Sequence, residues 1–148
     1  MSGARQTPVS ELAQQVVAKR AGPSANATVL AAAALRTYDE LVRVAAPLIG
    51  QGGVEALMSR AVHLARRQYP WLGSERPDSP EQEEDTFAQV AKRLERAEAG
   101  SAANAAGAVF GLSAGLLATL IGDGLTSSLL YKAWPDAFPM PAKRSDNE

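Results

Sequence analysis

The sequence predicts an all-α fold, a single-domain bundle of five to six helices around a small-residue central helix. Apolar residues recur at spacings of three and four, as in amphipathic helices, and no run of alternating β-branched residues interrupts them. The chain is 46% hydrophobic but only 5% aromatic, and alanine supplies much of the apolar content. Small side chains favour closely packed helices over a sheet. The third observation is a long uncharged segment, residues 101–122.

Composition limits the classes of function. A chain of 148 residues suits one domain. The net charge of −1 gives no overall field that would attract nucleic acid, so we expect no nucleic-acid partner. Cysteine is absent, which excludes disulfides and thiolate chemistry and fits a reducing compartment. The N-terminal stretch has no apolar signal region, and we expect a cytoplasmic bacterial protein.

The first two helices are predicted before and after a Gly-Pro pair. Thr7 and Pro8 suit the cap and first position of a helix that ends at Gly22. Its apolar stripe comprises Val9, Leu12, Ala13, Val16 and Val17. The next helix is predicted over 27–46, with a kink or break near Ala46 because Pro47 removes a backbone donor. Its stripe comprises Leu30, Ala34, Tyr38, Leu41, Ala45 and Leu48.

A third helix is predicted over 54–68 and a fourth over 80–99. The third helix stops at "YPWLG", and a charged linker follows at 72–79. Ser79 and Pro80 form a strong start for the fourth helix, whose acids come early and bases late, an order that complements the helix dipole. The inward residues are Val54, Leu57, Met58, Ala61, Leu64 and Ala65 in the third helix, and Phe87, Val90, Ala91, Leu94 and Ala97 in the fourth.

The uncharged segment allows three interpretations. It is long enough to span a bilayer, and Gly107, Gly111 and Gly115 form the small-residue ridge that lets two helices approach closely. However, its alanines, glycines and polar residues transfer weakly into lipid, and no aromatic belt marks its ends. We therefore expect a central helix over 102–121 that is buried by protein. A membrane span and a partly exposed dimer helix are the alternatives.

The C-terminal part is predicted to hold a short helix over 125–134 and then a polar, proline-rich tail. We expect the tail, residues 135–148, to be disordered, so that the helical domain covers 1–134. Trp71, Trp134, Phe138 and Met140 lie after helix ends and in the tail. These side chains either staple the bundle or present an apolar patch to a partner.

A short motif, Ala-x-Leu-Ile-Gly-x-Gly, occurs at 46–52 and again at 118–124. A glycine-rich turn before a helix can bind phosphate, but neither copy supplies the Lys or Ser/Thr of such loops, and Asp123 would repel an anion. The motif therefore predicts a structural corner. Gly50 and Gly122 are expected to end their helices in the left-handed conformation, and Gly52 or Gly124 to let the chain reverse. Two pseudo-symmetric hairpins would explain the repeat, and chance similarity is the alternative.

No catalytic, cofactor or metal site is predicted. Glu55, Ser59 and His63 share one helix face, but a catalytic triad needs the histidine between the other two. Arg60 stands where a di-metal bundle would place its glutamate, and one histidine without cysteine makes zinc binding unfavourable. A phosphoryl-accepting His63 is a further alternative.

The sequence therefore favours a non-enzymatic interaction or regulatory module that self-associates, as a homodimer for example, and docks a protein partner. The predicted contact residues are Arg60, His63, Arg67, Gly107, Gly111, Gly115 and Trp134. The first three form an exposed basic stripe that would steer an acidic partner or would simply be solvated. The alternatives are a membrane-associated protein that inserts residues 102–121, and a ligand-binding or enzymatic bundle with a site near Tyr38, His63 and Asp123.

Overall fold

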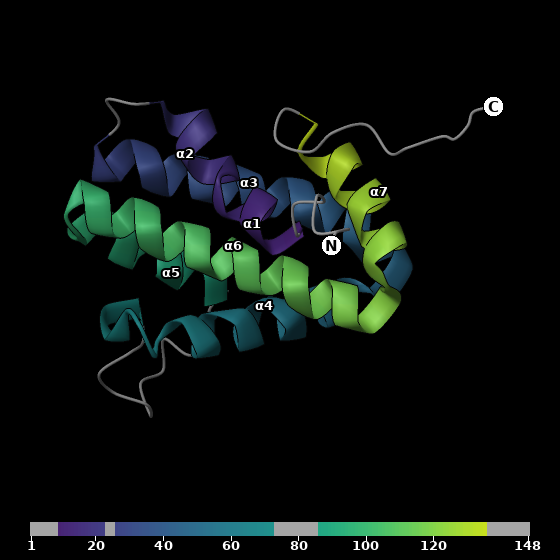
Figure 1. Ribbon diagram of the computed structural model, residues 1–148. Helices are drawn as coiled ribbons and strands as arrows, with labels where there is room; N and C mark the ends of the chain where they lie inside the picture. Colours follow the sequence, from purple (N-terminus) through teal and green to yellow (C-terminus); the bar gives the residue numbers. More distant parts are fainter. Residues whose placement is uncertain (1–8, 23–25, 73–85, 136–148) are drawn as a thin grey trace, which may run out of the picture.

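The computed structural model describes residues 9–22, 26–72 and 86–135, and these residues form helices and their connections (Figure 1). Their helices are α1 (Val9–Gln14), α2 (Val16–Ala21), α3 (Ala27–Ile49), α4 (Gln51–Ala65), the short 3-10 helix η2 (Pro70–Leu72), α5 (Thr86–Arg96), α6 (Ala99–Ile121) and α7 (Asp123–Ala133). Only Gln15 separates α1 from α2, so the two are segments of one broken helix. The prediction of an all-α bundle is confirmed.

The N-terminal helix has the predicted core face and one unpredicted break. Ala13, Val16 and Val17 are fully buried. At Gln15 the main-chain N–H donates to Leu12 O at 3.1 Å, a tighter turn than that of an α-helix. Thr7, Pro8 and Pro23 lie outside the described residues.

Helix α3 is longer than predicted, because it continues through Pro47 to Ile49. A proline in the last turn removes one hydrogen bond, and the N–H of Gly50 closes that turn on Ala46 O at 2.7 Å. The predicted end at Ala46 is therefore wrong. The extra turn carries Leu48 to the surface, where 49% of it is exposed, so its predicted core position is also wrong. At the other end, the Asn26 side chain accepts a hydrogen bond from the N–H of Val29.

Helix α4 begins three residues earlier than predicted, directly after Gly50. Its inward face agrees with the prediction: Val54, Met58, Ala61 and Ala65 are buried, and Leu57 and Leu64 are half-buried. Beyond α4, η2 buries Leu72.

Helix α5 ends three residues before the predicted end of the fourth helix, and the central helix α6 begins three residues earlier than predicted. The chain leaves the helical conformation after Arg96 and α6 starts at Ala99. The inward residues Phe87, Val90, Ala91 and Leu94 are buried as predicted. The cap at Ser79 and Pro80, most of the linker and the tail after Pro135 lie outside the described residues.

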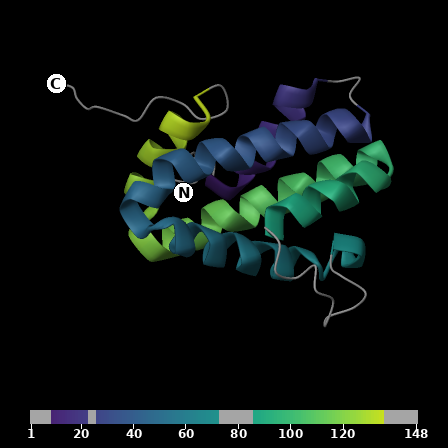
Figure 2. The same ribbon diagram turned by 180° about the vertical axis from the view of Figure 1, so that it is seen from behind.

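Helix α6 is the centre of the bundle. It contacts each of the other six α-helices, and it runs along the length of the molecule between them (Figures 1 and 2). Its buried residues are mostly small, Ala102, Ala105, Ala106, Gly107, Gly111, Ser113 and Ala114 among them. Among the described helices, α6 alone is long and apolar enough to cross a membrane. Half of its most apolar 18-residue stretch is buried against the other described helices.

The helices pack as two related units. Helices α1 and α4 pack on α6, and α5 and α7 pack on α3, whereas α2 lies mainly against α3. The main contacts therefore match when α1, α3 and α4 of the first unit correspond to α5, α6 and α7 of the second. Helices α3 and α6 each have 23 residues, and one glycine follows each of them. These relations support the pseudo-symmetric hairpins that the repeated motif suggested.

An aromatic chain joins the two units at the core. Tyr38 of α3 stacks on Phe87 of α5, with ring centroids 4.7 Å apart, and Phe87 contacts Phe110 of α6 at 5.5 Å. Phe110 in turn meets Trp134 edge to face at 5.8 Å. Tyr38 precedes Gly50 by as many residues as Phe110 precedes Gly122, so equivalent positions of both hairpins supply aromatic rings.

Candidate functional site

Both copies of the repeated motif form a corner that turns on one glycine. Gly50 has φ 84° and ψ 152°, and Gly122 has φ 94° and ψ 155°. Their amides donate to Ala46 O and Ala118 O, each at 2.7 Å. This backbone region is open essentially to glycine alone, and it is not the left-handed helical region that the sequence suggested. Gly52 and Gly124 already lie in the next helix, so the reversal predicted for them is wrong.

The corner amides are thus occupied within the chain. Since the N–H of each corner glycine bonds to a carbonyl of the preceding helix, it does not face a ligand. Asp123 is exposed at the start of α7, where it would repel an anion. The geometry supports the structural interpretation of both motifs.

The two corners lie at the same end of the bundle (Figures 1 and 2), and exposed leucines lie close to each corner in the sequence. The exposed fractions are 49% for Leu48, 62% for Leu120 and 49% for Leu125. The other large exposed hydrophobics of the described chain, Val29 and Leu35, lie elsewhere along α3. We call Leu48, Leu120 and Leu125 the apolar end. Its residues are adjacent to the repeated motif, but the sequence reading placed Leu48 in the core and did not single out the other two.

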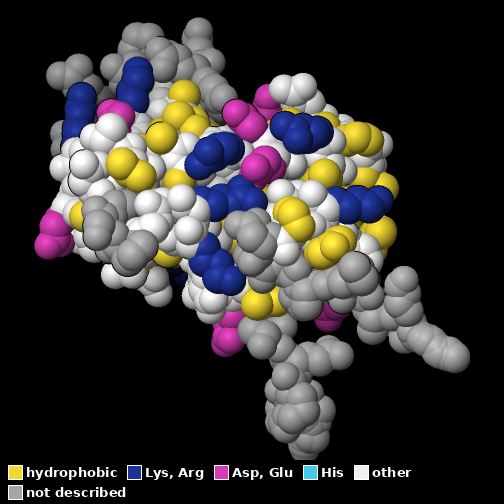
Figure 3. Space-filling view, turned by 90° about the horizontal axis from the view of Figure 1, so that it is seen from above, with side chains coloured by type: hydrophobic (Ala, Val, Ile, Leu, Met, Phe, Trp, Pro, Cys, Tyr) yellow, Lys and Arg dark blue, Asp and Glu magenta, His cyan; other side chains and the backbone are white. Residues whose placement is uncertain are grey.

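Helix α4 and the turn that follows it carry the predicted basic stripe on their exposed side. Arg60, His63 and Arg67 are all exposed, and none of them forms an ion pair or hydrogen bond with a described side chain. The sole carboxylate on α4 is Glu55, more than a turn before Arg60. Bases at this end of a helix also complement its dipole. By contrast, the face over α2, α3 and α7 mixes both signs of charge (Figure 3), and there Arg20 and Glu40 form an ion pair.

The stripe does not assemble catalytic groups. Glu55, Ser59 and His63 are all exposed along one helix, with the serine between the other two. Tyr38, His63 and Asp123 do not share a pocket: Tyr38 is buried against Phe87, whereas the other two are exposed on different helices. Among the described residues, no group of three or more His, Asp or Glu side chains could hold a metal ion.

The glycine ridge of α6 faces its own chain for most of its length. A Cβ atom on Gly107 would lie 2.7 Å from the main-chain oxygen of Gln14, so α1 makes the close approach there. Gly111 is buried, and Gly115 is half-buried with open space beside it. Gly107 and Gly111 are therefore buried within the described chain, and their role as partner contacts stays a prediction.

Trp134 is a staple and not a surface contact. It is fully buried, and its indole Nε1 donates a hydrogen bond to Thr37 O at 3.1 Å. In this conformation Trp134 is covered by its own chain, and its expected role in partner binding stays a prediction. Trp71 is half-buried and packs edge to face on Tyr69, with centroids 6.2 Å apart. Phe138 and Met140 lie outside the described residues.

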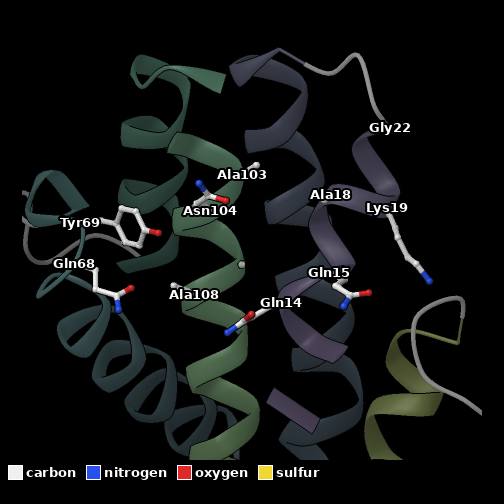
Figure 4. A pocket seen from close by; sticks show the side chains of 11 residues that line it. Gln14, Gln15, Ala18, Lys19, Gly22, Gln68, Tyr69, Ala103, Asn104 and Ala108 are labelled. Carbon is white, nitrogen blue, oxygen red and sulfur yellow. The ribbon is translucent and has the colours of Figure 1, made fainter. Parts of the chain in front are cut away.

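A groove that the sequence did not reveal lies between α1–α2, α6 and the residues that follow α4 (Figure 4). Its volume is about 690 Å³. Gln14, Gln68, Tyr69 and Asn104 converge around Ala108, and we call this site the amide groove. Within the described part of the chain, none of these four side chains makes a hydrogen bond. Sequence patterns could not find the groove, because its residues come from three segments far apart and each resembles an ordinary exposed residue.

Comparison with models of protein families, with curated proteins and with solved structures finds no match for this chain. The structure thus offers three surfaces, the apolar end, the basic stripe of α4 and the amide groove, for a functional argument from physical chemistry.

Proposed function

We propose that this chain is a non-enzymatic helical interaction module that self-associates and docks a protein partner. The observation that carries the proposal is the apolar end. Of the five large hydrophobic side chains that are exposed in the described chain, three lie within three residues of a corner glycine, and the two corners lie at the same end of the bundle (Figure 1). Single exposed leucines are ordinary, but a shared apolar surface favours a protein contact.

A second copy of the chain is the occupant that the architecture favours. Leu48 and Leu120 occupy equivalent places, two residues before Gly50 and Gly122. The end therefore presents a similar element twice, and a two-fold dimer requires a surface that is complementary to itself. The corner segment 46–53 carries no charged side chain, whereas the exposed Asp123 lies between Leu120 and Leu125 at the other corner. A dimer through the apolar end would have to leave this carboxylate in solvent.

The partner-docking part of the proposal is supported by the basic stripe. Arg60 and Arg67, with His63 between them, present cationic groups that no described carboxylate neutralises. Such a surface would accelerate association with an acidic protein surface, and the effect would weaken as salt is added.

Sedimentation velocity over a concentration series tests self-association. We expect a concentration-dependent dimer for the wild type and a monomer for the double variant Leu48→Glu/Leu120→Glu, since charges at these positions would be buried in the dimer. Val29→Glu is the matched control, because Val29 is a similarly exposed apolar residue at the opposite end of α3. A wild type that stays monomeric would refute self-association. A dimer that survives the double substitution would refute the apolar end as its interface.

The membrane alternative has support of its own, since α6 passes the length and hydropathy test. The proposal includes a cytoplasmic location, in which α6 stays covered by its neighbours. Fractionation of cells without detergent distinguishes the two: we expect recovery in the soluble fraction. Recovery in the membrane pellet alone would favour insertion of α6 and contradict the proposed function.

A further inference from the structure

We infer that two copies of this chain can exchange halves, so that the first half of one copy packs on the second half of the other. The first half runs from α1 to η2, and the second half runs from α5 to α7. The partner is thus a second copy of the chain, and the surface is the one by which each half covers the other. The inference goes beyond the proposed function, because it requires neither the apolar end nor the basic stripe.

Each half depends on the other half to complete its core. The first helix of each half packs on the long helix of the opposite half, α1 on α6 and α5 on α3. The last helices also pack across the halves, α4 on α6 and α7 on α3. A half on its own would expose apolar side chains that this packing buries, such as Met58 and Phe87. Their burial drives the pairing of the halves, whichever copy supplies the second half.

Specific contacts between the halves make the fit selective for this chain. The Trp134 indole of the second half donates its hydrogen bond to Thr37 O of the first half. The main chain at Gln14 lies so close to Gly107 that a Cβ there would be 2.7 Å from the Gln14 oxygen. These contacts are noncovalent, and a second copy presents the same atoms. An exchanged pair can therefore reproduce each of them.

The covalent connection between the halves is the segment 73–85. A segment of this length can span up to about 45 Å when extended, which is enough to reach a neighbouring copy. Pairing within one chain is favoured at low protein concentration, because the linked half has a high effective concentration. High protein concentration during folding therefore favours exchange, which is a known route to dimers.

The test uses cysteine trapping, since the chain has no cysteine of its own. Met58→Cys and Ser113→Cys are made as two single variants, because Ser113 Oγ lies 3.5 Å from Met58 Sδ across the halves and both residues are buried. The two variants are unfolded in urea, mixed, refolded at high concentration and oxidised. In an exchanged pair the two thiols meet, so we expect a covalent dimer on a non-reducing gel. Either variant refolded alone should give none.

The double variant Met58→Cys/Ser113→Cys is the positive control. Refolded at low concentration, it should close the disulfide within one chain, which shows that a disulfide can join the two positions.

Cleavage of the connector distinguishes exchange from a dimer through the apolar end. A protease recognition site is inserted between Gly73 and Ser74 of the full chain, and the dimer that forms during refolding is isolated and cleaved. An exchanged dimer should fall to the mass of one chain in sedimentation velocity, because no covalent link then joins its two lobes. A dimer through the apolar end should keep its mass.

Three results would overturn the inference: no dimer forms on refolding, the dimer keeps its mass after cleavage, or the mixed single variants give no covalent dimer although the double variant closes. If the double variant does not close, the cleavage experiment decides. The variant Leu48→Glu/Leu120→Glu should exchange halves as the wild type does. This last measurement separates the two proposals, because exchange can succeed where association through the apolar end fails.

Discussion

The indole Nε1 of Trp134 donates a hydrogen bond to the main-chain oxygen of Thr37 across 3.1 Å, and so joins the end of the second hairpin to the middle of the first. The same ring meets Phe110 edge to face at the core. One side chain thus contributes a buried polar contact and a large apolar surface where α7 packs on α3. The stability of the pseudo-symmetric arrangement should depend strongly on it.

Substituting Trp134 should lower the free energy of unfolding in two steps. Trp134→Phe keeps an apolar ring but removes the donor and some volume, for an expected loss of about 1–3 kcal/mol. Trp134→Ala should cost about 3–5 kcal/mol, because it also leaves a cavity. Urea unfolding followed by circular dichroism measures both. Trp71→Phe is the control, and a loss as large as that of Trp134→Phe would argue against the special place of Trp134.

Replacing a corner glycine with alanine should destabilise the protein, whereas replacing Gly52 or Gly124 should not. Gly50→Ala and Gly122→Ala place a Cβ in a backbone region that only glycine adopts freely, and each should cost about 1–3 kcal/mol. Gly52→Ala and Gly124→Ala lie in helical turns with open space around the added atom. These changes should be neutral or stabilise by up to about 1 kcal/mol. Thermal unfolding of the four variants would contradict the corner geometry if both pairs behaved alike.

The glycines within α6 should respond in opposite directions. Gly107→Ala places its Cβ against the main-chain oxygen of Gln14, and backbone must shift to admit it, at an expected cost of about 1–3 kcal/mol. Gly115→Ala meets nothing within 4 Å and should stabilise by about 1 kcal/mol through helix propensity. Chemical denaturation compares the two. Equal effects would show that α1 does not approach Gly107 closely.

Thr126 marks a polar defect in the second hairpin. Its Oγ1 is buried and has no hydrogen-bond partner in the described part of the chain. Val54 takes the equivalent position in the first hairpin, as the fourth residue after the corner glycine, and is fully buried. Thr126→Val should therefore stabilise the protein by about 1 kcal/mol, which thermal unfolding can measure. Val54→Thr is the reciprocal variant and should destabilise the protein. If instead Thr126→Val destabilised the protein and Val54→Thr stabilised it, the two positions would not be equivalent.

The helices and their inward faces could be predicted because spacing alone determines them. Val16, Met58 and Phe87 each lie three or four residues from other apolar residues, as on one face of a helix, and all three are buried. The ends were less predictable. Local preference suggested a break before Pro47, but a proline in a last turn costs one hydrogen bond only, and the corner glycine closes the turn. Leu48 was misplaced for the same reason.

The candidate surfaces could be predicted only in part. The exposure of Arg60, His63 and Arg67 follows from the apolar stripe on the opposite side of α4. Gly107 and Trp134 carry no mark in the sequence that distinguishes a contact inside the chain from a contact with another copy. The amide groove depends on tertiary packing, since Gln14, Gln68 and Asn104 come together only when α1, α6 and the end of α4 are assembled.

The two corners should also not tolerate an inserted or deleted residue. Each joins its helices through one residue, so an insertion or deletion beside Gly50 would rotate α4 by about 100° about its axis. Val54 and Met58 would then leave the core, and the basic stripe would turn toward α6. An insertion or deletion beside Gly122 would rotate α7 in the same way and move Trp134 away from Thr37. Tags, loops and fused domains should therefore be kept away from both corners, where the register of an entire helix depends on a single peptide unit.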